Sequence, residues 1–172
     1  MTDLSIYIWS LGGVTAVLAF LVAWLLHHKR KVSSAKSLII DGSNVMHWKS
    51  NTPDIQSVVG VIEALTRQGF YPGVVFDANA GYLVAGKYRH HGDLARMLGL
   101  PEQRVMVVPK GTPADPIILQ AARDMGARIV TNDRFRDWIE DYPEIQDDGY
   151  LIRGGYQSEQ VYFSQALKDG VR

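Results

Sequence analysis

The chain has 172 residues, of which 18 are basic and 18 are acidic, so its formal net charge is zero and bulk charge does not indicate nucleic-acid binding. It contains no cysteine. Disulfide bonds, a disulfide-linked partner, thiolate metal sites and a cysteine nucleophile are therefore excluded.

The N-terminal segment is predicted to span a membrane as one helix. Residues 4–26 carry no charged side chain, and a helix of that length crosses about 30 Å of hydrocarbon. Asp3 precedes this apolar run and a basic cluster at residues 27–31 follows it, whereas a cleavable signal peptide carries its positive charge first. Because basic residues stay on the cytoplasmic side, we expect a retained single-pass anchor with its N-terminus outside and the remaining chain in the cytoplasm.

A buried core helix is the alternative interpretation of this segment, but a small domain has little means of covering so long an apolar stretch. Gly12 and Ala16 have the small-xxx-small spacing that pairs membrane helices, which leaves a homodimer open. The chain is expected to divide into an anchor with its basic flank at residues 1–31, a linker at 32–36 and one soluble domain at 37–172.

Short apolar runs alternate with amphipathic stretches through the soluble domain. Such alternation predicts right-handed βαβ units and a mostly parallel sheet covered on both faces. The expected fold is a three-layer α/β/α sandwich with four to five strands, preceded by one transmembrane helix. In chain order, the predicted elements are a strand at 37–41, a helix at 52–69, a strand at 74–77, a helix at 93–98, a strand at 105–108, a helix at 112–126, a strand at 128–131, a helical start at 132–133, a strand at 150–153 and a closing helix at 157–168.

Three of the four main predicted strands are followed by a carboxylate, namely Asp41, Asp77 and Asp133. Ligands of an open parallel sheet bind outside the carboxyl ends of its strands, so these side chains are expected to meet there. Like charges repel at short range, which suggests that a cation lies between them.

Two further carboxylates occur near predicted helix starts. Asp115 lies in a first helical turn, and Asp133 and Asp137 are four residues apart, a spacing that places both on one helical face. An all-oxygen ligand set favours Mg²⁺ or Mn²⁺ over Zn²⁺. The alternative for Asp115 and Asp133 is a favourable charge at a helix N-terminus, and for Asp77 a turn.

Four sequence motifs carry a resemblance to a known family. They are LIIDGSN at residues 38–44, VFD at 75–77, AD at 114–115 and TNDRFRD at 131–137. Together they resemble the NYN domains, a branch of the PIN-like nucleases, and are most similar to the Regnase-type ribonucleases over residues 37–140. The resemblance implies a metal-dependent endoribonuclease that cleaves single-stranded or looped RNA.

The resemblance also implies roles for individual residues. Its acidic, catalytic centre corresponds to Asp41, Asp115, Asp133 and Asp137, and Asn44 corresponds to the side chain that steadies the first aspartate. Asp77 matches some PIN-like members only. Where Regnase-type enzymes often have a second aspartate, this chain has Pro116.

The resulting hypothesis is that Asp41, Asp115 and Asp133 hold one or two Mg²⁺ or Mn²⁺ ions, with Asp137 and Asp77 supporting them. Thr131 or Asn132 could hydrogen-bond a phosphate, although capping the next helix is the alternative. RNA contacts are expected from basic residues near the site, which are Lys87, Arg89, Lys110, Arg134 and Arg136.

Two other functions fit parts of this pattern. A catalytically inactive, membrane-tethered RNA-binding or adaptor module would keep the fold without cleaving RNA. A haloacid-dehalogenase-like phosphatase also uses an Asp-x-x-x-Asp pattern, but it needs an acid two residues after its nucleophile, and Ser43 occupies that place.

Overall fold

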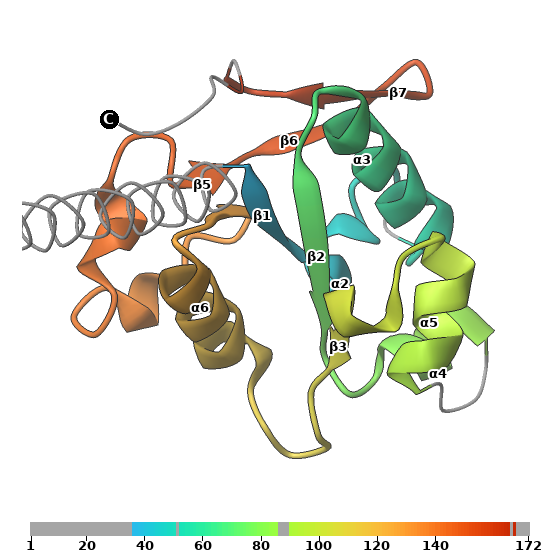
Figure 1. The fold of residues 1–172 in the computed structure, drawn as a ribbon, viewed down its shortest axis with the longest axis horizontal. Helices are drawn as coiled ribbons and strands as arrows, with labels where there is room; N and C mark the ends of the chain where they lie inside the picture. Colours follow the sequence, from blue (N-terminus) through green and yellow to red (C-terminus); the bar gives the residue numbers. More distant parts are fainter. Residues whose placement is uncertain (1–35, 51, 86–89, 166, 168–172) are drawn as a thin grey trace, which may run out of the picture. The chain divides into compact units, whose positions relative to one another are not determined.

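Five parallel strands form one sheet, in the spatial order β3-β2-β1-β4-β5 (Figure 1). The computed structural model describes residues 36–50, 52–85, 90–165 and 167. Asp41 is paired with Val75 of the next strand, and Ile40 with Val130, so the carboxyl ends of the three central strands lie at one edge. The strands are β1 (Ser37–Asp41), β2 (Tyr71–Phe76), β3 (Val105–Val107), β4 (Arg128–Val130) and β5 (Leu151–Ile152). The predicted mostly parallel sheet, including its fifth strand, is confirmed.

Helices cover both faces of the sheet, with α3 (Ile55–Arg67) and α5 (His91–Leu98) on one side and α6 (Ala114–Met125) on the other (Figure 1). Strand β1 shows why both faces need a cover. Leu38 and Ile40 belong to the hydrophobic core beneath α3 and α5, whereas Ile39 belongs to the core beneath α6. Because successive strand side chains alternate between faces, an uninterrupted apolar strand is buried only in such a three-layer arrangement.

The three helices predicted at residues 52–69, 93–98 and 112–126 are confirmed with shifted starts. The α3 helix begins after the predicted start at residue 52 and is capped by Asp54, whose carboxylate accepts a hydrogen bond of 2.9 Å from the Gln56 N–H. The α5 and α6 helices end at Gly99 and Gly126, both in the left-handed conformation that glycine adopts without steric cost.

Several short elements were not predicted, because a turn or two of helix has too few residues to show a hydrophobic period. They are α2 (Gly42–Val45), α4 (Ala80–Ala85), and the 3-10 helices η1 (Glu102–Arg104), η2 (Arg136–Trp138) and η3 (Pro143–Gln146).

The prediction of a closing helix at residues 157–168 is wrong. Strands β6 (Gly154–Gln157) and β7 (Gln160–Phe163) form an antiparallel hairpin instead. Ser158 and Glu159 have φ angles of 48° and 65°, the positive values of a two-residue hairpin turn. The Tyr156 hydroxyl also donates a hydrogen bond of 2.7 Å to the Ser57 carbonyl of α3, so tertiary contact holds the hairpin in place.

The prediction of a helix starting at residues 132–133 is also wrong. Phe135 has a φ angle of 47°, which a helix does not allow, and only η2 follows it. The Asp133 carboxylate accepts a hydrogen bond of 2.8 Å from the Phe135 N–H and thereby closes a local turn. Asp133 and Asp137 therefore do not share a helical face.

The predicted membrane anchor at residues 4–26 lies outside the described residues, as does most of the linker. Within the part that the structure describes, no helix is long and apolar enough to cross a bilayer. The division of the chain at residues 31 and 36 stays a prediction.

Candidate active site

The sheet has a topological switch point between β1 and β4. From β1 the chain builds the sheet outward through β2 and β3, then returns to place β4 and β5 on the other side of β1. The connections that follow β1 and β4 run to opposite sides, and this leaves a crevice at the carboxyl ends of the two strands. Such a crevice is the usual ligand site of open α/β sheets. Asp41 ends β1 and residues 131–133 follow β4, so the predicted carboxylates flank this crevice.

Asp41 is a buried carboxylate, with 7% of its surface exposed. Its Oδ1 accepts a hydrogen bond of 3.1 Å from the Asn44 N–H, and its Oδ2 accepts one of 2.9 Å from the Thr131 hydroxyl. The pKa of Asp41 is raised to about 6, chiefly by burial and in part by the charges of Asp115 and Asp133, while the two hydrogen bonds oppose that rise. The carboxylate is thus held in one orientation at an electrostatic cost.

The two residues after Asp41 fix the end of β1 against β2. A Cβ atom on Gly42 would lie 2.4 Å from Cε1 of the Phe76 ring, so only glycine fits this close approach. The Ser43 hydroxyl accepts a hydrogen bond of 2.9 Å from the Asp77 N–H. The DGSN motif is therefore also a packing motif.

Asn44 joins β1 to the segment after β4. Its side-chain oxygen accepts hydrogen bonds from the Trp48 indole N–H at 2.8 Å and from the Asn132 N–H at 2.9 Å. The expected role of Asn44 in steadying Asp41 is filled by its backbone N–H, while its side chain contacts other partners.

Thr131 links the Asp41 carboxylate to the backbone of Asp133. Its side chain is completely buried; its hydroxyl donates to Asp41 and accepts a hydrogen bond of 3.0 Å from the Asp133 N–H. The sequence suggested a phosphate contact or a cap, and this bridging role was missed. The only signal for it was a hydroxyl at the end of a buried strand.

Asn132 has a structural role at the start of the hairpin. Its side chain donates a hydrogen bond of 2.9 Å to the Gly154 carbonyl and accepts one of 3.2 Å from the Gly154 N–H. The Trp48 ring packs against Gly154 as well, where a Cβ atom would lie 2.8 Å from Cζ3. Trp48 is therefore part of the scaffold of the site, as its partial burial indicates.

Asp115 completes a set of mutually interacting carboxylates. It lies in the first turn of α6, and burial raises its pKa, as do the charges of Asp133 and Asp137, while a hydrogen bond from the Trp138 side chain lowers it. Asp41 in turn is influenced by Asp115 and Asp133. Asp133 acts electrostatically on both Asp41 and Asp115, and Asp137 acts on Asp115, so the four predicted acidic residues lie in one electrostatic neighbourhood. None of them forms an ion pair within the described residues.

An open cavity of about 530 Å³ lies beside these carboxylates. Its lining combines acidic and basic side chains with two amides: Asn44, Asn132, Asp133, Arg134, Arg136 and Asp137. The two arginines are exposed, as is Lys110 in the loop after β3. Lys87 and Arg89, the other predicted RNA contacts, lie outside the described residues.

Asp77 has the turn-forming role that was its alternative interpretation. Its Oδ1 accepts a hydrogen bond of 2.7 Å from the Asn79 N–H, and its own N–H is bound by Ser43. Its predicted contribution to a metal site has no support in these contacts.

The residues present fit a hard divalent cation that keeps part of its hydration shell. Among the described side chains, no three of the His, Asp and Glu type are spaced to hold one ion directly. Mg²⁺ is commonly bound through one or two carboxylates and several waters, and does not need a closed protein cage. The all-oxygen donors and the raised pKa of Asp41 agree with such binding.

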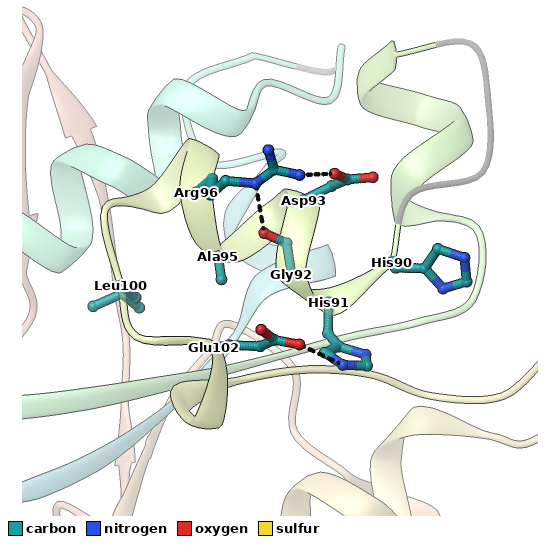
Figure 2. Close-up of a pocket in the computed structure, with 8 residues that line it drawn as sticks. All are labelled: His90, His91, Gly92, Asp93, Ala95, Arg96, Leu100 and Glu102. Carbon is teal, nitrogen blue, oxygen red and sulfur yellow. Dashed lines mark hydrogen bonds and ion pairs between the residues drawn. The ribbon is translucent and has the colours of Figure 1, made fainter.

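His90 and His91, which are adjacent in the sequence, do not belong to the acidic set. They line a separate pocket of about 450 Å³ at the start of α5, shown in Figure 2. The His91 ring turns toward Glu102, with 3.0 Å between Nε2 and Oε1, and the His90 ring points away from that pair. The two rings therefore do not face one ion.

The fold and the acidic crevice define the class of PIN-like nucleases. The sequence model described as the Zc3h12a-like ribonuclease NYN domain matches residues 34–163, and the chain belongs to this family. No curated protein sequence matches the chain significantly.

Solved structures with a similar fold include the nuclear protein-only RNase P 2 (PRORP2) of Arabidopsis thaliana. One crystal structure of it has a TM-score of 0.55 and 18% identity, covering 73% of this chain and 29% of that one. A second structure has a TM-score of 0.55 and 14% identity, covering 91% of this chain and 34% of that one. The present chain thus spans about a third of these neighbours, and the likeness shows a shared fold.

Proposed function

We propose that this protein is a membrane-anchored, metal-dependent endoribonuclease that cleaves single-stranded or looped RNA. The observation that supports this best is the convergence of Asp41, Asp115 and Asp133 from separate parts of the chain at the switch point of the sheet. Membership of an NYN ribonuclease family agrees with it. Carboxylates that gather without forming an ion pair repel one another, and a bound cation would offset that repulsion.

Asp41, Asp115 and Asp133 would hold Mg²⁺ or Mn²⁺, in part through water. Such an ion, when bound, lowers the pKa of an attacking water and neutralises charge on the leaving oxygen of a phosphodiester. The chain itself supplies orientation. Thr131 fixes the Asp41 carboxylate and the backbone before Asp133 with one hydroxyl, so the two acidic side chains are positioned together.

The RNA backbone would be held by basic residues around the crevice. Arg134 and Arg136 share the cavity with Asp133 and Asp137, where guanidinium groups can pair with phosphate oxygens. Lys110 is exposed at the same edge of the sheet. The roles proposed for Lys87 and Arg89, and for a homodimer, rest on the sequence alone.

The anchor is proposed from the uncharged residues 4–26 and the basic residues after them. It would leave the nuclease domain in the cytoplasm. Flotation of the full chain with vesicles after an alkaline carbonate wash tests it, since a peripheral protein would be released.

The nuclease is tested with single-site variants of the full chain in Mn²⁺. Asp41→Asn and Asp133→Asn should each abolish cleavage of an unstructured RNA while circular dichroism stays unchanged. Asp148→Asn is the matched control, because Asp148 is exposed and lies before β5, and it should cleave at the wild-type rate. Cleavage that persists in Asp41→Asn would reject the mechanism.

An RNA-binding adaptor is the second candidate. It would bind the same RNA in Mg²⁺ or Mn²⁺ without turnover, and Asp41→Asn would leave binding unchanged. The phosphatase alternative has less support. Ser43 occupies the position where the acid is needed, and its hydroxyl accepts a hydrogen bond from the Asp77 N–H.

A further inference from the structure

Basic residues lie at the starts of the strands, at the edge of the sheet opposite to the carboxylates. Lys36 precedes β1, Arg104 precedes β3, and Arg128 is the first residue of β4. These cations form a strand-start patch together with the end of α3 and the first residue of β2, defined as Lys36, Arg67, Tyr71, Arg104 and Arg128. The patch therefore gathers cations at this edge, while the opposite edge holds the carboxylates together with the exposed cations Lys110, Arg134 and Arg136.

Four members of the strand-start patch, Lys36, Tyr71, Arg104 and Arg128, contact one another or an aromatic ring. The Arg104 guanidinium lies 5.5 Å from the centre of the Tyr71 ring, and that of Arg128 lies 5.6 Å from the centre of the Phe70 ring. The Tyr71 N–H donates a hydrogen bond of 2.9 Å to the Lys36 carbonyl. These contacts connect residues at the starts of β1, β2, β3 and β4.

The outer part of this surface is open to solvent. Tyr71 is 53% exposed, and the Arg67 side chain is 72% exposed with a loose ion pair of 3.8 Å to Glu63. Arg67 and Arg104 also border a groove of about 740 Å³ between α3 and the segment after α5. Apolar side chains line much of that groove, among them Val59, Ile62, Met97 and Leu100.

Strand β5 limits the patch to one side of the edge. Asp147 and Asp148 precede it, so the edge is acidic beyond β4. The basic surface covers the starts of β3, β2, β1 and β4. Exposed cations next to a tyrosine are the composition that settles at the headgroup level of an anionic bilayer.

The length of the chain before β1 argues for a bilayer as the occupant. Residues 27–36 separate the uncharged segment from Ser37, and ten extended residues span at most about 35 Å. The connection enters the domain at the start of β1, beside Lys36. Because the five strands are parallel, their starts share this edge and the carboxylates lie at the other one.

We propose that the strand-start patch docks on the anionic headgroups of the membrane that holds the anchor, and thereby turns the carboxylate edge toward RNA in solution. The inference rests on the proposed anchor and on the fold, and not on catalysis. Negative headgroups attract the patch, and in this orientation the exposed cations of the opposite edge, Lys110, Arg134 and Arg136, remain available to RNA. The attraction acts only within about 10 Å at moderate salt, a distance that the short connection permits.

Energy transfer to a labelled lipid measures this orientation in the full chain reconstituted in vesicles. The absence of cysteine allows single labels at Gln103→Cys, beside the patch, and at Thr112→Cys, in the loop that leads from β3 to α6. With phosphatidylserine present, the donor at 103 should lie nearer the bilayer than the donor at 112 by about 17 Å, the length of a five-residue strand. In pure phosphatidylcholine the difference should shrink.

Charge reversal separates this surface from other causes. Arg67→Glu with Arg104→Glu should remove the difference between the labels, and so should 1 M salt, which shortens screening to about 3 Å. Arg153→Glu is the matched control, since Arg153 follows β5 at the other edge, and it should keep the difference. The salt result does not depend on how the double variant folds.

Each remaining outcome is decisive. Equal distances at every lipid composition, or a nearer donor at 112, would overturn the docking even if the chain floats and cleaves RNA. Loss of flotation after carbonate would overturn both anchor and docking, while nuclease activity could persist. Weaker RNA binding by the double variant, with unchanged distances, would assign the patch to RNA and reject the membrane.

Discussion

At the residue scale, Asp41 is the residue at which a functional requirement for charge opposes the stability of the fold. It is nearly inaccessible to water, yet its pKa of about 6 leaves it charged at neutral pH. Two hydrogen bonds hold it, from the Asn44 N–H and the Thr131 hydroxyl, and two carboxylates repel it. A buried charge with this balance reduces stability and is retained for a task that needs it.

The raised pKa of Asp41 predicts a pH-dependent cost in the metal-free protein. The folded state holds the proton more tightly than the unfolded state, whose pKa is near 3.8, so the cost is absent below pH 3.8, grows up to about pH 6 and is complete above it. Asp41→Asn should therefore be more stable than wild type in EDTA at pH 7.5, by about 1–3 kcal/mol, and not at pH 4. Urea unfolding at both pH values measures this, and equal stability at pH 7.5 would contradict the raised pKa.

Thr131 is predicted to position Asp41 and the backbone before Asp133. Thr131→Ala leaves one carboxylate oxygen and one N–H without their partner, so the metal concentration at half-maximal cleavage should rise by about 10–100-fold. Thr131→Ser keeps the hydroxyl and should restore it. Mn²⁺ titrations of cleavage and of metal binding distinguish the two, and an equal loss in both variants would show that the methyl group matters instead.

The sequence was sufficient to place Asp41 and Asp133 after neighbouring strands, because strand ends can be located from apolar runs. Asp77 forms a turn instead, and the helical face predicted for Asp133 and Asp137 is absent. The sequence did not predict how the carboxylates are held. Thr131, which binds the Asp41 carboxylate, lies 90 positions further along the chain, and Asn44 binds the Asn132 N–H across 88 positions. Such pairings depend on the sheet order, which the local pattern does not contain.

At the element scale, the connections between strand ends shape the crevice more than the strands do. The α2 turn brings Gly42 against the Phe76 ring and Ser43 against the Asp77 N–H, so the ends of β1 and β2 are locked together. The hairpin of β6 and β7 reaches the same region through Gly154, which contacts Asn132 and Trp48. The predicted closing helix would have removed this support.

Gly42→Ala is predicted to destabilise the domain by about 1–3 kcal/mol, because its methyl group would overlap the Phe76 ring. Gly92→Ala is the matched control, since the nearest atoms there are the movable end of the Glu102 side chain at 3.4 Å. Thermal unfolding measures both. Combining Gly42→Ala with Phe76→Leu should recover part of the loss, and an additive loss would place its cause elsewhere.

The two errors of element type have one physical origin. Ser158 and Phe135 adopt positive φ angles that their residue types rarely take, so no glycine or proline marked these turns. The Tyr156 hydroxyl stabilises the first by a tertiary hydrogen bond, and the Asp133 carboxylate stabilises the second by accepting a local one from the Phe135 N–H. A local sequence pattern predicts an element well where the hydrophobic period and the turn residues agree, as in the helix that ends at Gly126. It fails where hydrogen bonds formed in the folded chain determine the backbone conformation.

At the scale of the whole molecule, the parallel sheet determines where charge can gather. All five strands point the same way, so residues that follow a strand meet at one edge and residues that precede a strand meet at the other. The carboxylate crevice and the strand-start patch are consequences of this one arrangement. It also makes the repulsion among the four carboxylates a property of the folded domain, since unfolding separates them.

Metal binding is therefore predicted to stabilise the fold as a whole. An ion that binds only the folded state adds about 2.7 kcal/mol at a concentration 100 times its Kd, which raises Tm by roughly 10 °C in a domain of this size. Mn²⁺ should produce this shift in wild type and in Asp148→Asn, and little of it in Asp41→Asn. Calorimetry of the full chain in detergent, with EDTA as the reference, measures all three. An identical shift in Asp41→Asn would mean that the ion binds away from the crevice, and then the repulsion at Asp41 would need another partner to offset it.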